Sequence, residues 1–400
     1  MSGEKQFISG DEAVALAVKQ AKPHVIAAYP ITPQTIVVER LADYVEEGEL
    51  ESKYMYVESE HSALSALFGA SGVGARTFTA TSSQGLLYMA ECLHFTSGGR
   101  YPIVMMNANR SLALPWSIFG DQRDSLSQRD AGWIQLYVEN VQEAYDSIFH
   151  AYRIAEDPRV MTPVMVNLDG FILTHTYELL ETLPQEQADA FIPYADYANC
   201  IKFDEENPMN IAITGGPLLN MEFRFQQQRA MNDALKVIEE TDKAFGELTG
   251  RTYGGGLVEA YRCEDAEVVL LSLGSLCGTI HVVVDEYRKA GKKVGLLKLR
   301  SFRPFPVDKV AEALSGARAV GVVEKDISFG YEGAVYSEVN SALIKKGLCP
   351  LTRNYVGGLG GRNFSKEDIC GMFDDLLEGA PADSVQFVNL RGDIDYGNEC

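Results

Sequence analysis

The sequence lacks any run of apolar residues long enough to cross a membrane. A membrane-spanning helix needs about 20 consecutive apolar residues, and no segment of this 400-residue chain approaches that length. The first residues, Met1 to Gln6, also lack the basic and apolar regions of a secretory signal peptide. These absences argue against a membrane or secreted protein, and we expect a cytoplasmic one.

The sequence also lacks the motifs that hold metal ions or clusters. Its seven cysteines are an odd number without any C-x-x-C pair, and its six histidines are scattered without a ligand motif such as H-E-x-x-H. A disulfide framework, a zinc site and an iron–sulfur site are therefore not encoded in this chain. Any metal ion or cluster in the functional protein would lie on another chain.

Basic clusters are missing as well. The chain has 35 Lys and Arg against 56 Asp and Glu, which gives a formal net charge of -21. Nucleic-acid binding needs basic patches that neutralise phosphates, so this charge argues against a nucleic-acid partner. A solvated acidic surface that aids solubility is the simplest interpretation of the excess, and a basic partner subunit is the alternative.

The apolar and charged residues that are present predict two globular domains. An apolar content of 46% is ordinary, and 400 residues exceed what one compact core usually holds. Short apolar runs alternate with helical periodicity in the first part of the chain and again in the last, which predicts parallel sheets with crossover helices. We predict an α/β fold with two doubly wound parallel-sheet domains, at 1–177 and 263–400, joined by an irregular arm with a surface helix at 178–262. The tail after about residue 380 is polar.

Local signals place the individual elements. Ser9 and Glu12 form a capping-box pattern at the start of the first predicted helix. We predict further helices at 34–47, 60–73, 84–95, 141–155, 226–248, 279–290, 307–314 and 333–346, and strands ending at 29 and covering 54–57, 77–81, 101–106, 133–138, 163–168, 266–272, 293–298 and 319–324.

The segment Tyr29-Pro30-Ile31-Thr32-Pro33 closes an apolar run just before a predicted helix. The two prolines fix their own φ angles and restrict the residues before them, so Thr32 is held stiffly between strand and helix. Because helix N-termini and the carboxyl edge of a parallel sheet favour anions, we predict that Thr32 binds a carboxylate or phosphate. The alternative is that Thr32 only caps the helix.

Polar side chains also follow the next two strands. Glu60 comes after the strand at 54–57 and opens a helix of small residues. A carboxylate there can hydrogen-bond a protonated ring nitrogen of a cofactor, or it can simply be a favourable residue in the first helical turn. The strand at 77–81 leads into Ser82 and Ser83, whose hydroxyls reach the same edge unless they only cap the next helix.

Arg110 follows the strand predicted at 101–106. A planar guanidinium binds a carboxylate through two parallel hydrogen bonds. An arginine at a strand end is often a surface or ion-pair residue, but Thr32 on a neighbouring loop makes the two a reasonable pair of anchors for a small carboxylate. Arg123 and Arg129 alternate with acidic residues, so we interpret them as structural ion-pair partners.

The stretch 357–362 is rich in glycine. It matches neither the G-x-G-x-x-G fingerprint nor a P-loop, and no P-loop lysine is present. We therefore predict a bent loop near the domain interface.

Together these segments resemble the α subunit of thiamine-dependent 2-oxoacid:ferredoxin oxidoreductases, of which the pyruvate enzyme is the best-known member. The resemblance covers nearly the full chain. It implies a thiamine pyrimidine-binding-like first domain and a transketolase C-terminal-like second domain. The segments that carry it are 29–33, 58–74, 82–85, 120–121, 129–130, 132–133, 168–171, 174–176, 272–275 and 298–306.

The resemblance implies roles for individual residues. Glu60 would contact the aminopyrimidine of thiamine diphosphate and promote the form that activates the C2 carbon, with Pro30 and Ser83 as further cofactor-binding residues. Thr32 and Arg110 would hold the substrate carboxylate. This chemistry agrees with a cofactor-dependent reaction, because decarboxylating a 2-oxoacid needs an electron sink that no side chain provides.

One absence gains meaning from the resemblance. Thiamine enzymes bind the diphosphate through magnesium with a Gly-Asp-Gly motif, and this sequence has none. The segment Gly120-Asp121-Gln122 is no substitute, because the third glycine lets the backbone turn beside the metal. The resemblance therefore implies that a β subunit carries the diphosphate and Mg²⁺ site, that iron–sulfur clusters lie on other subunits, and that this chain is inactive alone.

We therefore interpret the chain as the α subunit of a 2-oxoacid oxidoreductase that converts pyruvate and coenzyme A to acetyl-CoA and carbon dioxide and passes electrons to ferredoxin. A branched-chain or aromatic 2-oxoacid such as phenylglyoxylate is the alternative substrate. Two other hypotheses are a transketolase-like or E1 component that works without ferredoxin, and a non-catalytic acidic scaffold subunit.

Overall fold

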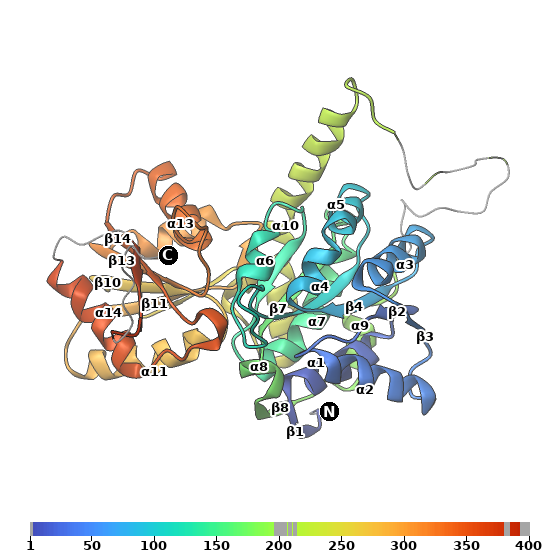
Figure 1. Cartoon of the computed structure of the whole chain (residues 1–400), viewed down its shortest axis with the longest axis horizontal. Helices are drawn as coiled ribbons and strands as arrows, with labels where there is room; N and C mark the ends of the chain where they lie inside the picture. Colours follow the sequence, from blue (N-terminus) through green and yellow to red (C-terminus); the bar gives the residue numbers. More distant parts are fainter. Residues whose placement is uncertain (1–2, 196–205, 207–209, 211–213, 380–384, 393–400) are drawn as a thin grey trace.

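The structure is a computed structural model and describes residues 3–195, 206, 210, 214–379 and 385–392. Two α/β halves lie side by side, the first in blue and green and the second mainly in orange and red (Figure 1). Each half is built on one large, mostly parallel sheet, so the predicted α/β class is confirmed. Within the described residues, no helix is both long and apolar enough to cross a membrane.

The first sheet has seven strands in the order β12-β6-β7-β5-β4-β2-β3. Its pairings are parallel except that of β12 with β6. Strands β4 to β7 are buried throughout, as is usual for a parallel sheet covered on both faces. The bounds are β2 Val25–Ala28, β3 Lys53–Tyr56, β4 Thr77–Thr81, β5 Val104–Asn109, β6 Ile134–Tyr137, β7 Val164–Asp169 and β12 Ser301–Arg303.

The helices of the first half begin largely where the sequence predicts. Ser9 is the N-cap of the first helix, and its capping box with Glu12 is present. The single helix predicted at 84–95 is instead two helices, α4 and α5, separated at Met89. The bounds are α1 Gly10–Ala21, α2 Thr35–Glu46, α3 Glu60–Gly72, α4 Ser83–Tyr88, α5 Ala90–Gly98, α6 Arg123–Ser127, α7 Val141–Ala155 and α8 Ile172–His175.

The second sheet has six strands in the order β15-β14-β13-β10-β11-β9, and only the β9–β11 pair is antiparallel. The bounds are β9 Val258–Tyr261, β10 Val268–Ser272, β11 Val294–Leu299, β13 Ala319–Glu324, β14 Leu351–Val356 and β15 Val385–Phe387, with helices α11 Leu276–Lys289, α12 Val307–Leu314, α13 Ala334–Lys345 and α14 Lys366–Glu378 and the short turns η1 Gly254–Gly256 and η2 Leu359–Gly361.

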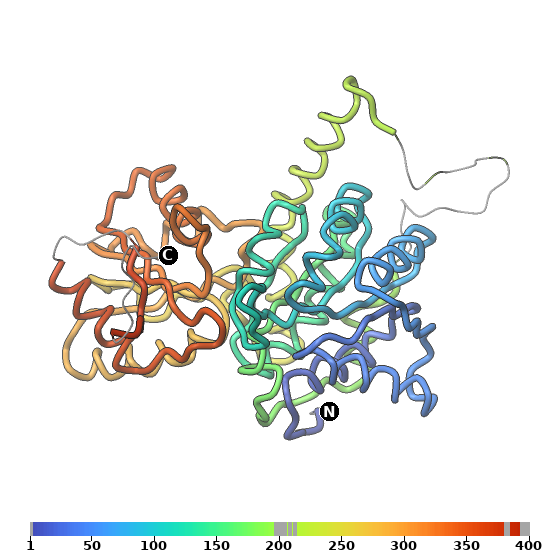
Figure 2. The backbone as a smooth tube through the Cα atoms, in the orientation of Figure 1, coloured from blue at the N-terminus to red at the C-terminus, as the bar shows by residue number. Residues whose placement is uncertain are grey.

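The connecting segment holds more regular structure than its sequence indicates. Strand β8 (Tyr177–Glu181) pairs with β1 (Lys5–Ser9), and α9 (Gln185–Phe191) follows it. Helix α10 (Asn220–Thr249) begins earlier than the predicted residue 226, and its first turns project from the body (Figure 2). Its later turns pack on the core of the first half through apolar side chains: Ala234, Val237, Ile238 and Phe245.

A buried ion cluster joins the two halves. The carboxylate of Glu143 on α7 accepts hydrogen bonds from Lys298 Nζ and Arg300 Nε, both at 2.8 Å. Lys298 also pairs with Glu139 at 2.8 Å, and Arg300 donates to Ser147 Oγ at 2.8 Å. Buried charges are tolerated only when they are paired and hydrogen-bonded, and this cluster satisfies both conditions.

Glu324, the last residue of β13, is also buried. Its carboxylate accepts hydrogen bonds from the backbone N–H groups of Val335 at 2.9 Å and Tyr336 at 3.2 Å, and from Asn354 Nδ2 at 2.6 Å. Burial, with a contribution from nearby Asp326, raises the pKa of Glu324 from 4.5 to about 8.

This carboxyl group predicts a pH dependence of stability. The unfolded chain releases the proton near the ordinary pKa of 4.5 and the folded chain only near a pKa of about 8, so the free energy of unfolding falls as pH rises through that window. Glu324→Gln removes the titrating group, and we expect the free energy of unfolding of the variant relative to that of wild type to rise as pH increases from about 5 to about 9. Thermal unfolding across that range checks this. Parallel pH curves for the two proteins would contradict it.

Candidate functional site

The polar residues predicted at the strand ends meet at the carboxyl edge of the first sheet. Strands β2, β4 and β5 are neighbours in the sheet and run parallel. The loops that follow them therefore emerge at one edge, together with the N-terminus of α3.

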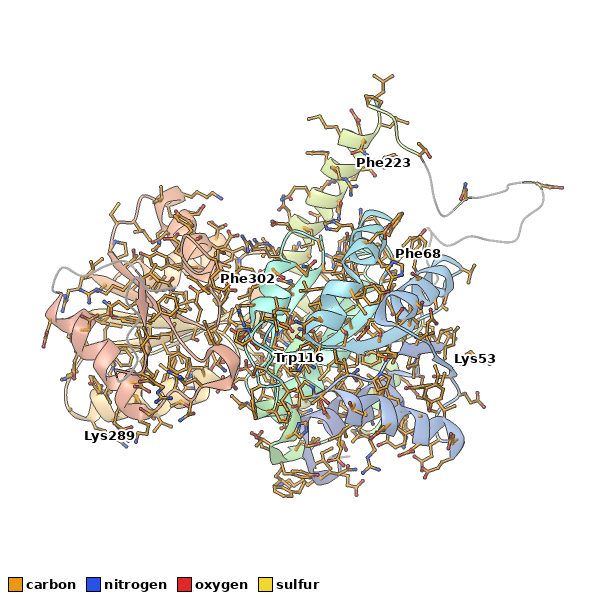
Figure 3. The ribbon with its side chains drawn as sticks, in the orientation of Figure 1. Lys53, Phe68, Trp116, Phe223, Lys289 and Phe302 are labelled. Carbon is orange, nitrogen blue, oxygen red and sulfur yellow. The ribbon has the colours of Figure 1, made fainter. Side chains whose placement is uncertain are left out.

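Arg110 joins two of these loops. Its Nη1 donates a hydrogen bond to the backbone oxygen of Thr32 at 2.7 Å, so the two residues lie on neighbouring loops as the sequence predicts. Their role as anchors of a carboxylate stays a prediction. The side chain is buried, and the guanidinium lies 5.6 Å from the ring of Trp116, which is labelled near the junction of the halves in Figure 3. Burial lowers the pKa of Arg110, while the carboxylates of Asp124 and Glu60 act in the opposite direction. Within the described part of the chain, its buried Nε has no hydrogen-bond partner.

Thr32 does not cap the helix that follows it. Helix α2 begins at Thr35 with Gln34 at its N-cap, and no side chain caps it. The Gln34 side chain instead turns back and donates to the carbonyl of Tyr29 at 3.0 Å, which holds the segment that contains Pro30. Thr32 and Pro30 are both exposed at this edge.

Glu60 is the first residue of α3 and is nearly buried. The helix is capped by its neighbour, because Ser59 Oγ accepts the N–H of Ser62 at 3.1 Å. The carboxylate of Glu60 lies against Gly85, where a Cβ atom would come within 2.5 Å of Oε1 and 2.7 Å of Thr81 Oγ1. Gly85 is therefore required for the carboxylate to occupy this place.

Ser83 holds the turn between β4 and α4. Its φ angle is +53°, and its hydroxyl donates to the carbonyl of Ser111 at 2.7 Å, while Gln84 Oε1 lies 2.6 Å from the same hydroxyl oxygen. Ser82 occupies the N-cap position, but its Oγ donates to the carbonyl of Ala108 at 2.7 Å rather than capping the helix. The direct contact of Ser83 with a cofactor stays a prediction.

Asp124 on α6 is a central residue that the sequence analysis missed. It is fully buried and accepts hydrogen bonds from the backbone N–H groups of Ser83 at 3.0 Å and Arg110 at 3.1 Å, and from Asn109 Nδ2 at 2.7 Å. Burial raises the pKa of Asp124 to about 6, and these hydrogen bonds oppose the shift. Nothing in the sequence indicated its burial, because the alternating acidic and basic residues around it are typical of a solvated surface.

Of the two neighbouring arginines interpreted as ion-pair partners, Arg123 forms an ion pair within the described residues and Arg129 does not. Arg123 pairs with Asp121 at 2.8 Å. The guanidinium of Arg129 instead donates to the carbonyl of Leu126 at 3.3 Å. The glycine-rich stretch at 357–362 is a bent loop at the junction of the halves, where Gly360 N–H donates to Asp121 Oδ2 at 3.1 Å and a Cβ on Gly361 would come within 2.4 Å of Phe119.

In the part of the chain that the structure describes, no group of three or more His, Cys, Asp or Glu side chains could hold a metal ion. A cavity of about 480 Å³ lies elsewhere, between α5 and the start of α10, with Phe68, Phe95 and Phe223 in its lining. We choose the carboxyl edge of the first sheet as the candidate site, because its side chains can bind a carboxylate and a cofactor, whereas the lining of that cavity contains none of the predicted residues.

Comparison with family models identifies both halves. The model described as pyruvate flavodoxin/ferredoxin oxidoreductase, thiamine diphosphate-binding, matches residues 16–243, which is more than half of the chain. The model described as pyruvate:ferredoxin oxidoreductase core domain II matches residues 266–369. Each sheet therefore has a counterpart in the same group of enzymes.

Individual relatives agree with the family models. The pyruvate synthase subunit PorA of Methanothermobacter thermautotrophicus is 48% identical over 364 residues, which cover 91% of this chain and 93% of the relative. The ketoisovalerate oxidoreductase subunit VorA of Pyrococcus abyssi is 45% identical over 372 residues, which cover 93% of each.

A solved structure shares the fold. The 2-oxoglutarate:ferredoxin oxidoreductase of Magnetococcus marinus, with 2-oxoglutarate, coenzyme A and succinyl-CoA bound, superposes with a TM-score of 0.71 at 19% identity. The match covers 94% of this chain, which spans 66% of the length of that one. The family models and the PorA relative show that the chain belongs to the pyruvate flavodoxin/ferredoxin oxidoreductase family and is a subunit of a 2-oxoacid:ferredoxin oxidoreductase.

Proposed function

We propose that this chain is the α subunit that binds the 2-oxoacid and the pyrimidine ring of thiamine diphosphate in a coenzyme A-dependent decarboxylation, with pyruvate as substrate and ferredoxin as electron acceptor. The observation that carries the proposal is the buried guanidinium of Arg110, whose Nη1 is bonded to Thr32 while its Nε has no partner among the described residues. A buried donor without a partner is costly unless a ligand satisfies it. A small carboxylate fits such a donor, because a guanidinium binds it through charge-assisted hydrogen bonds.

The residues at the edge fit the cofactor and the substrate in different ways. Thiamine diphosphate, when bound, supplies the electron sink for loss of carbon dioxide from a 2-oxoacid. Glu60, nearly buried at the start of α3, would accept a hydrogen bond from a protonated ring nitrogen of the pyrimidine. Thr32 would donate its hydroxyl to the substrate carboxylate, and Arg110 would neutralise the carboxylate charge. Pro30 and Ser83 are the further cofactor-binding candidates.

The other half of the cofactor site would come from a β subunit that binds the diphosphate with Mg²⁺, with iron–sulfur clusters on further subunits that deliver electrons to ferredoxin. Two features support this division. The sequence has no Gly-Asp-Gly motif. The loop beside Arg110 carries Leu114 and Trp116, which are 86% and 68% exposed, as expected of a surface that a partner covers. We place the assembled enzyme in the cytoplasm, and assign the pyrimidine to the first domain, 1–177.

The second candidate substrate is 2-oxoisovalerate. The VorA relative is 45% identical to this chain and the PorA relative 48%, so identity alone barely separates the two substrates. An aromatic 2-oxoacid such as phenylglyoxylate is a further alternative. A thiamine enzyme that works without ferredoxin is disfavoured by the matches to both ferredoxin oxidoreductase models.

Turnover of the purified complex with pyruvate, 2-oxoisovalerate and phenylglyoxylate, each with coenzyme A and ferredoxin, tests the substrate. We expect kcat/KM for pyruvate to exceed the other values by at least about tenfold, because a fitted pocket discriminates added carbons by roughly 10–200-fold. A preference for 2-oxoisovalerate would change the substrate and keep the reaction. Absence of turnover with all three in a complex with intact clusters would contradict the proposal.

Glu60→Gln tests the role of the carboxylate. We expect kcat in the assembled complex to fall by at least about 100-fold, because an amide cannot take part in proton transfer with the ring nitrogen. Glu58→Gln is the matched control, since Glu58 is an exposed carboxylate two positions earlier whose hydrogen-bond donor is the Ser62 hydroxyl. Wild-type kcat in Glu60→Gln would leave the scaffold hypothesis as the better one.

Gly85→Ala tests the placement of Glu60 without changing it. The new Cβ would overlap the space of Glu60 Oε1, where the gap is 2.5 Å, and should displace the carboxylate. We expect kcat/KM to fall by about 10- to 100-fold, since small misplacements of a catalytic group are costly. Gly69→Ala in α3 is the control, because a Cβ there meets no atom within 4 Å. Equal activity of the two variants would contradict the placement.

A further inference from the structure

Helix α6 and the turn before it lie between the second half and the candidate site. Gln122 N–H donates to the backbone oxygen of Lys325 at 2.9 Å, and Gln122 Nε2 donates to Asp169 Oδ1 at 3.1 Å. Gly360 N–H donates to Asp121 Oδ2 at 3.1 Å. Lys325 and Gly360 belong to the second half, so the start of α6 is held from outside the first sheet.

The inward side of α6 presents the carboxylate of Asp124. It receives five hydrogen bonds, which saturate both oxygens. Oδ1 accepts from Asn109 Nδ2 and Ser125 N, both at 2.7 Å. Oδ2 accepts from Ser83 N at 3.0 Å, Arg110 N at 3.1 Å and Asn107 Nδ2 at 3.3 Å.

Two of these donors lead directly to the site. The Ser83 N–H belongs to the first turn of α4, which also contains Gly85, and the Glu60 carboxylate packs against Gly85. The Arg110 N–H belongs to the residue whose guanidinium binds the Thr32 carbonyl. Oδ2 of Asp124 therefore holds the start of α4, against which Glu60 packs, at a fixed distance from the backbone of Arg110.

We propose that Asp124 is the positioning residue of this site. Its buried carboxylate holds the first turn of α4, against which Glu60 packs, and the loop that carries Arg110 at fixed relative positions. The carboxylate of Glu60 and the guanidinium of Arg110 therefore face the same bound substrate. The proposal rests on the proposed roles of Glu60 and Arg110 and adds a residue that touches neither substrate nor cofactor. Asp124 acts through the backbone of two loops, and its loss should disturb binding of the 2-oxoacid as well as stability.

A second buried carboxylate offers a matched control. Asp146 on α7 is also fully buried and accepts from Arg251 Nε at 2.7 Å, Arg251 Nη2 at 2.9 Å and the hydroxyl of Tyr253. None of these partners belongs to the loops of the site. At both positions an Asp→Asn change keeps the shape and turns one acceptor into a donor that faces other donors.

The experiment compares Asp124→Asn and Asp146→Asn in the assembled complex by thermal unfolding and steady-state kinetics. We expect both variants to lower the unfolding midpoint. Only Asp124→Asn should raise KM for the 2-oxoacid, by about tenfold, and lower kcat, with KM for coenzyme A unchanged within about twofold. Equal kinetics of the two variants would overturn the proposal and leave Asp124 as a structural residue.

Three further variants keep the test decisive. Asn109→Ala removes a donor to Asp124 and leaves the side chains of Glu60 and Arg110 unchanged, and should raise the same KM by about threefold even if Asp124→Asn does not assemble. Combining Asp124→Asn with Arg110→Ala should give a KM close to that of Arg110→Ala alone, because both act on one contact. Multiplying effects would overturn the proposal. A wild-type KM in Arg110→Ala would instead refute the substrate role of Arg110.

Discussion

One carboxylate and two cations, buried together, set how the two halves of this chain meet. Glu143 accepts from Lys298 and Arg300 at 2.8 Å each. Loss of Glu143 would leave the buried Arg300 guanidinium without a carboxylate partner, and breaking a buried ion pair in this way typically costs about 3–5 kcal/mol. Arg300 stands immediately before β12, so the same cluster fixes where the chain re-enters the first sheet. With that geometry set, Lys325 and Gly360 reach α6 and the loops behind it.

The candidate site is a consequence of parallel strands held in this frame. Residues 32, 60 and 110 are distant in sequence, yet neighbouring parallel strands deliver their loops to one edge. The sheet alone does not fix the positions of the loops relative to one another, because each loop could relax on its own. Hydrogen bonds between the loops fix these positions: Arg110 bonds to Thr32, Ser83 bonds to Ser111, and the backbone N–H groups of Ser83 and Arg110 both bond to Asp124. Placement and electrostatics are the contribution a protein makes to cofactor chemistry.

The local sequence predicted those helices and strands in which the spacing of apolar residues follows a single clear pattern. The predicted bounds of β4, α7, α12 and β13 coincide with the structure, since these segments are either short buried runs or strongly amphipathic helices. Thr32, Glu60 and Arg110 could be chosen because each follows a strand. Asp124 could not, because its importance lies in four donors from other segments and the stretch around it is rich in charged residues. The pairing of β8 with β1 and of β12 with β6 was equally hidden, because contacts between distant residues leave no period in a short strand.

Strand β12 has an implication for how the polypeptide reaches its native state. It is supplied by residues 301–303 yet completes a sheet whose other strands end at residue 169. Until the ribosome has made β12, the edge of β6 is left with unpaired N–H and C=O groups, and such open edges invite association with other chains. The amino-terminal sheet is therefore complete only after β9, β10 and β11 of the carboxyl-terminal half have been synthesised.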